Sequence, residues 1–77
     1  MTFTIEMVDP QRVILEEIAN KKFTRNSVAL TYAFCLRQRE EVDFGIVNRA
    51  ILERWSRSGL EYIKKKAWNL VEGKECA

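Results

Sequence analysis

The chain has 77 residues, with 13 Lys or Arg against 11 Asp or Glu, which is the length of one small domain with a nearly balanced charge. It contains no His, and this excludes His-based catalytic triads and mixed Cys/His zinc sites. Its 2 Cys are too few for a four-thiolate zinc site. We therefore expect no cofactor, no metal and no enzymatic activity.

The positions of the two cysteines and the composition of the N-terminus indicate in which cellular compartment the protein is expected. Cys35 lies in an apolar stretch and Cys76 is the penultimate residue, so a disulfide framework is not expected and a reducing compartment is favoured. The N-terminus has no basic run followed by an apolar segment, and the longest nearly apolar run, residues 28–36, is too short to cross a bilayer. We expect a cytoplasmic protein without a membrane segment.

The N-terminal segment predicts a strand followed by a helix. Residues 2–8 alternate apolar and polar side chains, which is the period of a half-buried strand. Asp9 can then accept hydrogen bonds from free backbone amides, and Pro10 presets φ at a first helical position. An apolar stripe containing Ile14 and Ile18 continues this first helix.

A second helix is predicted from Thr24, Asn26 or Ser27, each of which can cap it, through the residues VALTYAFCLRQRE. Its apolar residues in the range 28–36 occupy every side of the helical wheel. A helix of this kind is covered on all sides in folded proteins, and so short a chain has little with which to cover it. This predicts a homodimer in which the second helices of two copies share a core.

The C-terminal half predicts two further helices. Asp43 can cap a third helix, which carries an apolar stripe of Phe44, Val47, Ile51 and Trp55. Ser58 and Glu61 have the spacing of a capping box, which predicts a fourth helix that begins near Gly59 and stops at Gly73. One continuous helix over residues 43–72 is the alternative.

Residues 2–36 resemble a ribbon-helix-helix DNA-binding domain. The resemblance rests on the alternating segment FTIEM, on LEEIA in the first helix and on RNSVALTYAF after a short turn. It implies a mainly α fold with one short N-terminal strand, in which residues 1–42 form a β-α-α dimer. Residues 43–77 would then be a C-terminal helical extension packed in the same single domain.

The same resemblance implies how DNA would be bound. The strands of two chains would pair and enter the major groove of double-stranded DNA, where Thr2 and Thr4 would read base edges. The start of the second helix, at Arg25, Asn26 and Ser27, would bind phosphate. The positive end of a helix dipole and its unpaired amides favour an anion at that place in any fold.

The positive charge of the chain lies in its C-terminal half, because residues 1–42 contain six basic and six acidic side chains. That half also contains aromatic side chains that can stack on bases or anchor a protein partner. The candidate contacts to phosphate or to a partner in residues 43–77 are Arg54, Arg57, Tyr62, Lys64, Lys65 and Trp68.

The leading hypothesis is a small dimeric DNA-binding transcription regulator, a repressor of the ribbon-helix-helix type. The alternative is a small helical protein-interaction module, an inhibitor or adaptor that uses the Trp, Tyr and Lys surface of the C-terminal half. An antitoxin that binds DNA through residues 1–42 and a toxin through residues 43–77 is a third hypothesis. DNA binding should weaken steeply with salt, whereas a surface built on Trp and Tyr should be less sensitive.

Overall fold

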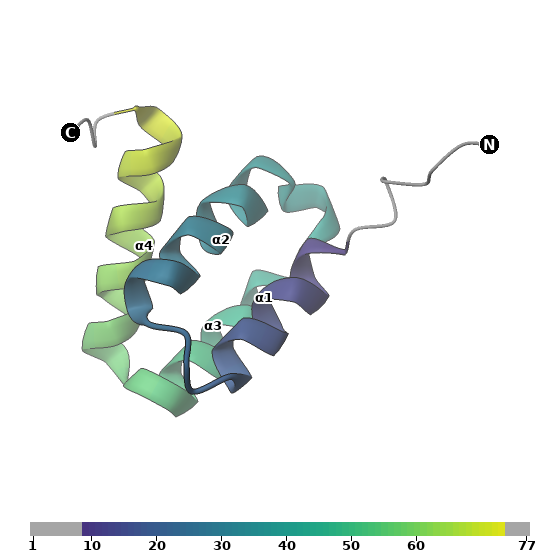
Figure 1. Cartoon of the computed structure of the whole chain (residues 1–77). Coiled ribbons are helices and arrows are strands. Elements are labelled where there is room, and N and C mark those ends of the chain that lie inside the picture. Colours follow the sequence, from purple (N-terminus) through teal and green to yellow (C-terminus); the bar gives the residue numbers. More distant parts are fainter. Residues whose placement is uncertain (1–8, 74–77) are drawn as a thin grey trace.

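The computed structural model describes residues 9–73, which form four α-helices and one short 3₁₀ helix (Figure 1). Within this range there is no β-strand, so the expected ribbon-helix-helix fold is wrong. The predicted strand, with Thr2 and Thr4, lies outside the described residues. The elements in chain order are α1 (Pro10–Ala19), α2 (Arg25–Arg37), η2 (Arg39–Glu41), α3 (Phe44–Trp55) and α4 (Arg57–Glu72).

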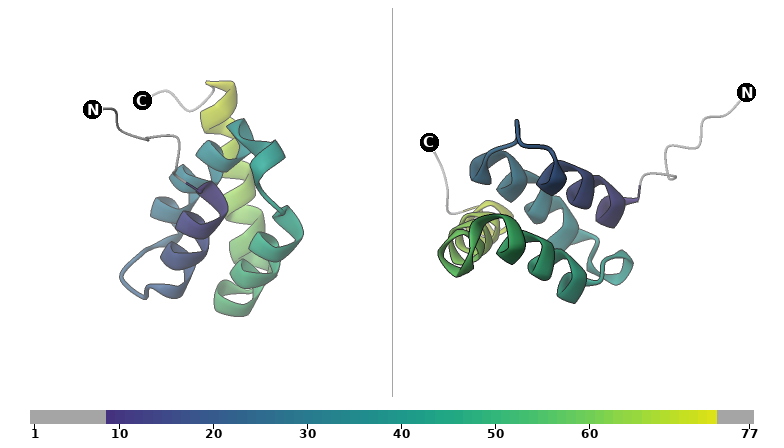
Figure 2. Two further views of the ribbon diagram at one scale, coloured as in Figure 1. Left: turned by 90° about the vertical axis from the view of Figure 1, so that its right-hand side faces the viewer. Right: turned by 90° about the horizontal axis from the view of Figure 1, so that it is seen from below.

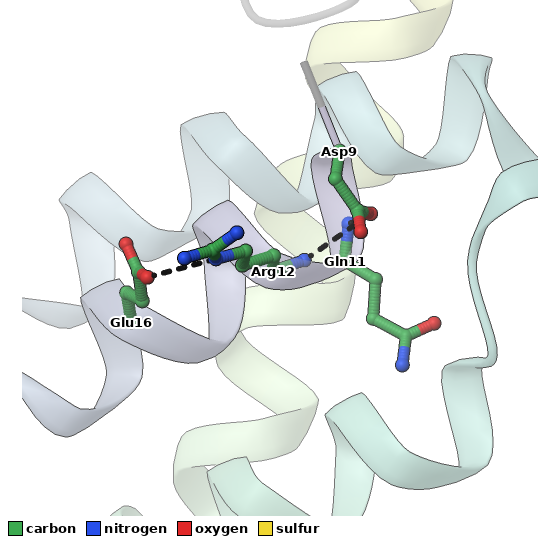
Figure 3. A network of polar contacts seen from close by, with 4 residues as sticks. All are labelled: Asp9, Gln11, Arg12 and Glu16. Atoms are coloured by element: carbon green, nitrogen blue, oxygen red, sulfur yellow. Dashed lines mark hydrogen bonds and ion pairs between the residues drawn. The ribbon is translucent and has the colours of Figure 1, made fainter. Parts of the chain in front are cut away.

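The start of α1 confirms the predicted cap. One carboxylate oxygen of Asp9 accepts hydrogen bonds from the backbone amides of Gln11 and Arg12, at 3.2 and 3.4 Å (Figure 3). Arg12 also forms an ion pair with Glu16 one turn later, with 3.3 Å between Nε and Oε2. The cap satisfies amides that have no partner inside the helix, and Pro10 lacks an amide hydrogen that would need one.

The starts of α2 and α3 use the same chemistry. Of the three candidate caps for α2, Thr24 is the cap, because its hydroxyl oxygen accepts from the backbone amide of Ser27 at 3.2 Å. Asp43 caps α3 as predicted, by accepting from the amides of Gly45 and Ile46. Gly73, in the left-handed conformation at φ 77°, ends α4.

A single residue separates α3 from α4, so residues 43–72 form two helices. Ser56 has φ 91° and ψ 179°, a backbone conformation that residues other than glycine rarely adopt. The predicted capping box is wrong, because the amide of Leu60 already donates to the Ser56 carbonyl at 3.1 Å and α4 therefore begins before Ser58. Gly59 permits the tight crossing, since a Cβ atom there would lie 2.4 Å from that of Trp55.

The helices form a ring in which each packs against two neighbours, in the order α1, α2, α4, α3 (Figure 2). All four contribute to the core, so α3 and α4 complete the burial of α1 and α2 and an intermolecular strand pair is not needed for it. The buried apolar residues of the described range are Ile14, Ile18, Val28, Ala29, Tyr32, Ala33, Cys35, Val47, Ile51, Leu60, Ile63 and Ala67.

The chain itself covers most of the apolar residues of α2. Five of its residues are buried, and side-chain hydrogen bonds join it to both helices of the opposite edge. The Thr31 hydroxyl donates to Glu17 of α1 at 2.5 Å, and the Tyr32 hydroxyl donates to Asn48 of α3 at 2.7 Å. The premise behind the predicted homodimer, that one chain cannot cover this helix, is therefore wrong for most of its apolar residues, and Leu30 and Phe34 are the ones left exposed. The dimer itself stays a prediction.

None of the helices within residues 9–73 is both long and apolar enough to span a bilayer.

Candidate nucleic-acid interface

Charge is divided between two opposite edges of the helix ring. The α2–α4 edge, defined here as residues 20–37 and 57–72, carries eight basic side chains against two acidic ones. The α1–α3 edge, which includes η2 and the caps Asp9 and Asp43, carries seven acidic side chains against four basic ones. The basic residues of the α2–α4 edge are Lys21, Lys22, Arg25, Arg37, Arg57, Lys64, Lys65 and Lys66, and its acidic residues are Glu61 and Glu72.

The first turn of α2 contacts Tyr62 of α4 on this edge. The Tyr62 hydroxyl donates a hydrogen bond to the side-chain oxygen of Asn26. The Arg25 guanidinium lies over the Tyr62 ring, with its carbon 5.4 Å from the ring centroid. The fold thus joins two of the three residues predicted at the start of the second helix with a residue predicted in the C-terminal half.

Ser27, the third residue predicted there, is part of the helix cap. Its backbone amide donates a hydrogen bond to the Thr24 hydroxyl oxygen, as described above. Its side-chain oxygen also accepts a hydrogen bond from the Thr24 hydroxyl at 3.2 Å. Its polar atoms therefore stabilise the start of α2, and the contact with Tyr62 belongs to Arg25 and Asn26.

An open cavity of about 300 Å³ lies beside Tyr62 and is lined by Tyr62, Lys65, Lys66 and Asn69. These four residues are spaced by three and four positions along α4, which places them on one side of the helix. Sequence reasoning missed Lys66 and Asn69, although their spacing from Tyr62 would have indicated them. The lining combines one aromatic ring, two ammonium groups and one amide, which are groups that bind bases and phosphates.

The outer side of α2 continues this surface with apolar side chains. Leu30 and Phe34 follow Asn26 by four and eight residues, so the three share one side of the helix. Leu30 is 60% exposed and Phe34 is 42% exposed, a fraction equal to that of Tyr62. We define the α2–α4 face as Arg25, Asn26, Leu30, Phe34, Tyr62, Lys65, Lys66 and Asn69.

Arg54, predicted as a phosphate contact, instead binds the end of α1 and the loop that follows it. Its guanidinium donates to the carbonyl oxygens of four residues at 2.7 to 3.2 Å, and it stacks on the Trp55 ring, with 4.1 Å between its carbon and the centroid. These bonds use both Nη atoms of the guanidinium, which are the donors that would otherwise reach a phosphate. The four carbonyls belong to Ile18, Asn20, Lys21 and Phe23.

The remaining predicted contacts lie on other sides of α4. Trp68 follows Tyr62 by six residues, which places it about 120° around the helix. Lys64 precedes Trp68 by one turn and shares its side, and Arg57 lies at the exposed start of the helix. The structure therefore brings Tyr62 and Lys65 to the α2–α4 face and separates Trp68 from it.

Neither buried titratable group of α2 belongs to the interface. Burial raises the pKa of Tyr32 to about 12, against the lowering effect of its hydrogen bond to Asn48. Burial also raises the pKa of Cys35 to about 11, and the charges of Glu17 and Asp9 add to this effect. A buried thiol with a raised pKa is a poor nucleophile. In the described part of the chain no group of three or more His, Cys, Asp or Glu side chains could hold a metal ion.

Comparisons with known proteins add no assignment to this geometry. The chain matches no family model, and neither the curated proteins nor the solved structures contain a significant match to it. The resemblance to ribbon-helix-helix proteins stays a prediction from short motifs, and the fold that it implied is the one corrected above.

Proposed function

We propose that the protein is a small helical nucleic-acid-binding protein, which binds the sugar–phosphate backbone through the α2–α4 face. The observation that carries the proposal is the contact of Arg25 and Asn26 with Tyr62. It joins the positive end of the α2 dipole to the basic helix α4 across 36 residues of sequence.

The roles of the side chains follow from their chemistry. A phosphate beside the first turn of α2 would meet backbone amides, the Asn26 amide group and the Arg25 guanidinium. The next phosphates along the strand would be neutralised by Lys65 on α4, with release of bound counterions. A role in transcription regulation in the cytoplasm, expected from the sequence, is part of this proposal and depends on DNA binding.

The first test is the salt dependence of binding to mixed-sequence DNA. If about three phosphates are neutralised, the association constant should fall by about 20- to 40-fold between about 50 and about 200 mM salt. Fluorescence anisotropy of a labelled oligonucleotide measures this fall.

A matched pair of double variants locates the binding surface. Arg25→Gln with Lys65→Gln removes two charges from the α2–α4 face, and Arg39→Gln with Arg49→Gln removes two from the opposite edge. The first pair should weaken binding by about tenfold or more and reduce the salt dependence, because each lost phosphate contact lowers the slope by about one. Equal losses in both pairs would show that only net charge matters and would overturn the assignment of the face.

A second candidate function, a protein-interaction module, is favoured by Trp68. Its side chain is 41% exposed and lies on a different side of α4 from the cavity. Exposed Trp side chains are frequent anchors in protein interfaces. Trp68→Ala should leave nucleic-acid binding unchanged if the two surfaces are independent, and weaker nucleic-acid binding in that variant would remove the reason for a second function.

A further inference from the structure

We propose that the α2–α4 face takes single-stranded nucleic acid in preference to duplex, with one base stacked on Tyr62 and another on Phe34. This inference rests on the proposed function and names its substrate class. The two rings come from neighbouring helices and are equally exposed, and the Arg25 guanidinium lies over the Tyr62 ring. Proteins that bind single strands combine a positively charged groove with aromatic side chains that bases can stack on.

The Tyr62 ring is held in position before any ligand arrives. Its hydroxyl is bonded to Asn26 and the Arg25 guanidinium lies against the ring, yet the residue remains 42% exposed. A side chain whose orientation is already fixed loses little conformational entropy when a base stacks on it. The contact also brings a cation close to the point where the phosphate of that nucleotide would lie.

The cavity beside Tyr62 fits a nucleotide better than an apolar side chain of a protein partner. Its volume of about 300 Å³ is at the lower end for small-ligand sites, and three of its four lining residues are polar or charged. Asn69 can donate to and accept from the edge of an unpaired base, and Lys65 can contact a phosphate. An apolar anchor would use neither the hydrogen-bonding groups of Asn69 nor the charge of Lys65.

The outer side of α2 argues against a duplex. A helix that reads the major groove presents polar side chains to the base edges, and those edges are the only parts of a paired base that it can reach. Here the side between Asn26 and Arg37 presents Leu30 and Phe34. Apolar and aromatic groups gain contact with the flat faces of bases, which are free only in a single strand.

The experiment compares a single strand with its duplex for the full chain and two variants of one residue. Tyr62→Phe and Tyr62→Leu both remove the hydroxyl bonded to Asn26, so only the loss of the ring distinguishes them. The single strand should bind at least about tenfold more tightly than the duplex. Relative to Tyr62→Phe, Tyr62→Leu should weaken single-strand binding by about 5- to 150-fold, the range measured for loss of one stacking partner. A fluorescent base analogue in the strand should be quenched by the native protein and by Tyr62→Phe, and quenched less by Tyr62→Leu, in which Phe34 is the remaining stacking partner.

Phe34→Leu should give a smaller loss of the same kind, and Trp68→Leu, on another side of α4, is the control that should cause none. Tight binding of the duplex, equal to that of the single strand, would overturn this inference and leave the proposed function standing. Equal affinities of Tyr62→Phe and Tyr62→Leu, with both variants shown to be folded by thermal unfolding, would also overturn it. Binding to neither form would overturn the proposed function itself and favour the protein partner of Trp68.

Discussion

Arg54 shows how a long-range contact changes the role of a residue. In the sequence it is one basic side chain in a basic half of the chain, and this suggested a phosphate contact. In the structure its guanidinium fills a cluster of carbonyl oxygens that lie 31 to 36 residues earlier. No local pattern contains this information, because the carbonyls converge only after α1 and the following loop have packed against α3.

Replacement of Arg54 should therefore affect stability. Arg54→Lys keeps the charge but cannot donate to four carbonyls at once, since an ammonium lacks the planar fork of donors. Hydrogen bonds to charged groups contribute about 1.5 to 3 kcal/mol each, and this cluster is only partly buried. We expect the free energy of unfolding to fall by about 2 kcal/mol, measured by denaturant titration.

Arg57→Lys is the control for this measurement, because Arg57 is exposed at the start of α4. Its midpoint of unfolding should not move. An Arg54→Lys protein with the midpoint of the native chain would show that the four hydrogen bonds contribute nothing to the fold.

At the scale of single elements, the sequence predicted the starts of the first three helices and the end of the last, whereas the second helix was predicted to run through residue 40 and ends at Arg37. Asp9, Thr24 and Asp43 cap their helices through amides within three residues, so the capping interaction is contained in a short stretch of sequence. Gly73 ends α4 for an equally local reason, its positive φ. The capping box at Ser58 was wrong because the strained backbone of Ser56 starts α4 two residues earlier than the side-chain pattern suggested.

The environment of α2 was not predictable from its own residues. A helical wheel treats the helix as isolated, and on it the apolar residues of the range 28–36 require cover from all directions. In the folded chain α1 and α4 cover two sides, and side chains of α3 reach Tyr32 through Asn48 and through the Phe44 ring, 5.4 Å between centroids. Only a strip containing Leu30 and Phe34 remains exposed.

The buried groups of α2 should make the fold sensitive to alkaline pH. The unfolded chain releases the Cys35 and Tyr32 protons near pH 9.0 and 10.0, whereas the folded chain holds them to about pH 11 and about pH 12. Between these pH values the folded state binds more protons than the unfolded state. The free energy of unfolding therefore keeps its full value below pH 9 and falls as the pH rises above it. Unfolding titrations at increasing pH should show this fall.

Tyr32→Phe isolates the contribution of the phenol to the alkaline transition. The variant should lose less stability than the native chain between pH 10 and 12, because it has no phenol proton to release. An identical alkaline transition in the native chain and in Tyr32→Phe would contradict the burial of this phenol.

At the scale of the whole molecule, the fold redistributes the charge that the sequence shows. Counted along the chain, residues 1–42 are neutral and the positive excess lies after them. In the ring of helices, α2 packs against α4, and the acidic residues of α1 and η2 lie on the opposite edge. The basic edge is thus assembled from both halves, and counting along the chain could not find it.

The ribbon-helix-helix interpretation failed at the same scale. Its motifs describe a strand and two helices, and the two helices do occur, with the predicted cap at Asp9. A helix followed by a turn and a second apolar helix is common to many folds, so these motifs contain no information on what packs against the pair. Here α3 and α4 do so within the same chain.

Binding of nucleic acid to the α2–α4 face is tested most directly by identifying the residues whose environment changes when the ligand binds. The backbone amide resonances of the isotope-labelled chain would be followed by NMR during titration with a single-stranded oligonucleotide at low salt. We predict shifts that cluster on residues 25–34 and 62–69, with the amides of α1 and α3 unchanged. Shifts centred on the α1–α3 edge, or no shifts at a concentration that saturates a weak nonspecific complex, would contradict it.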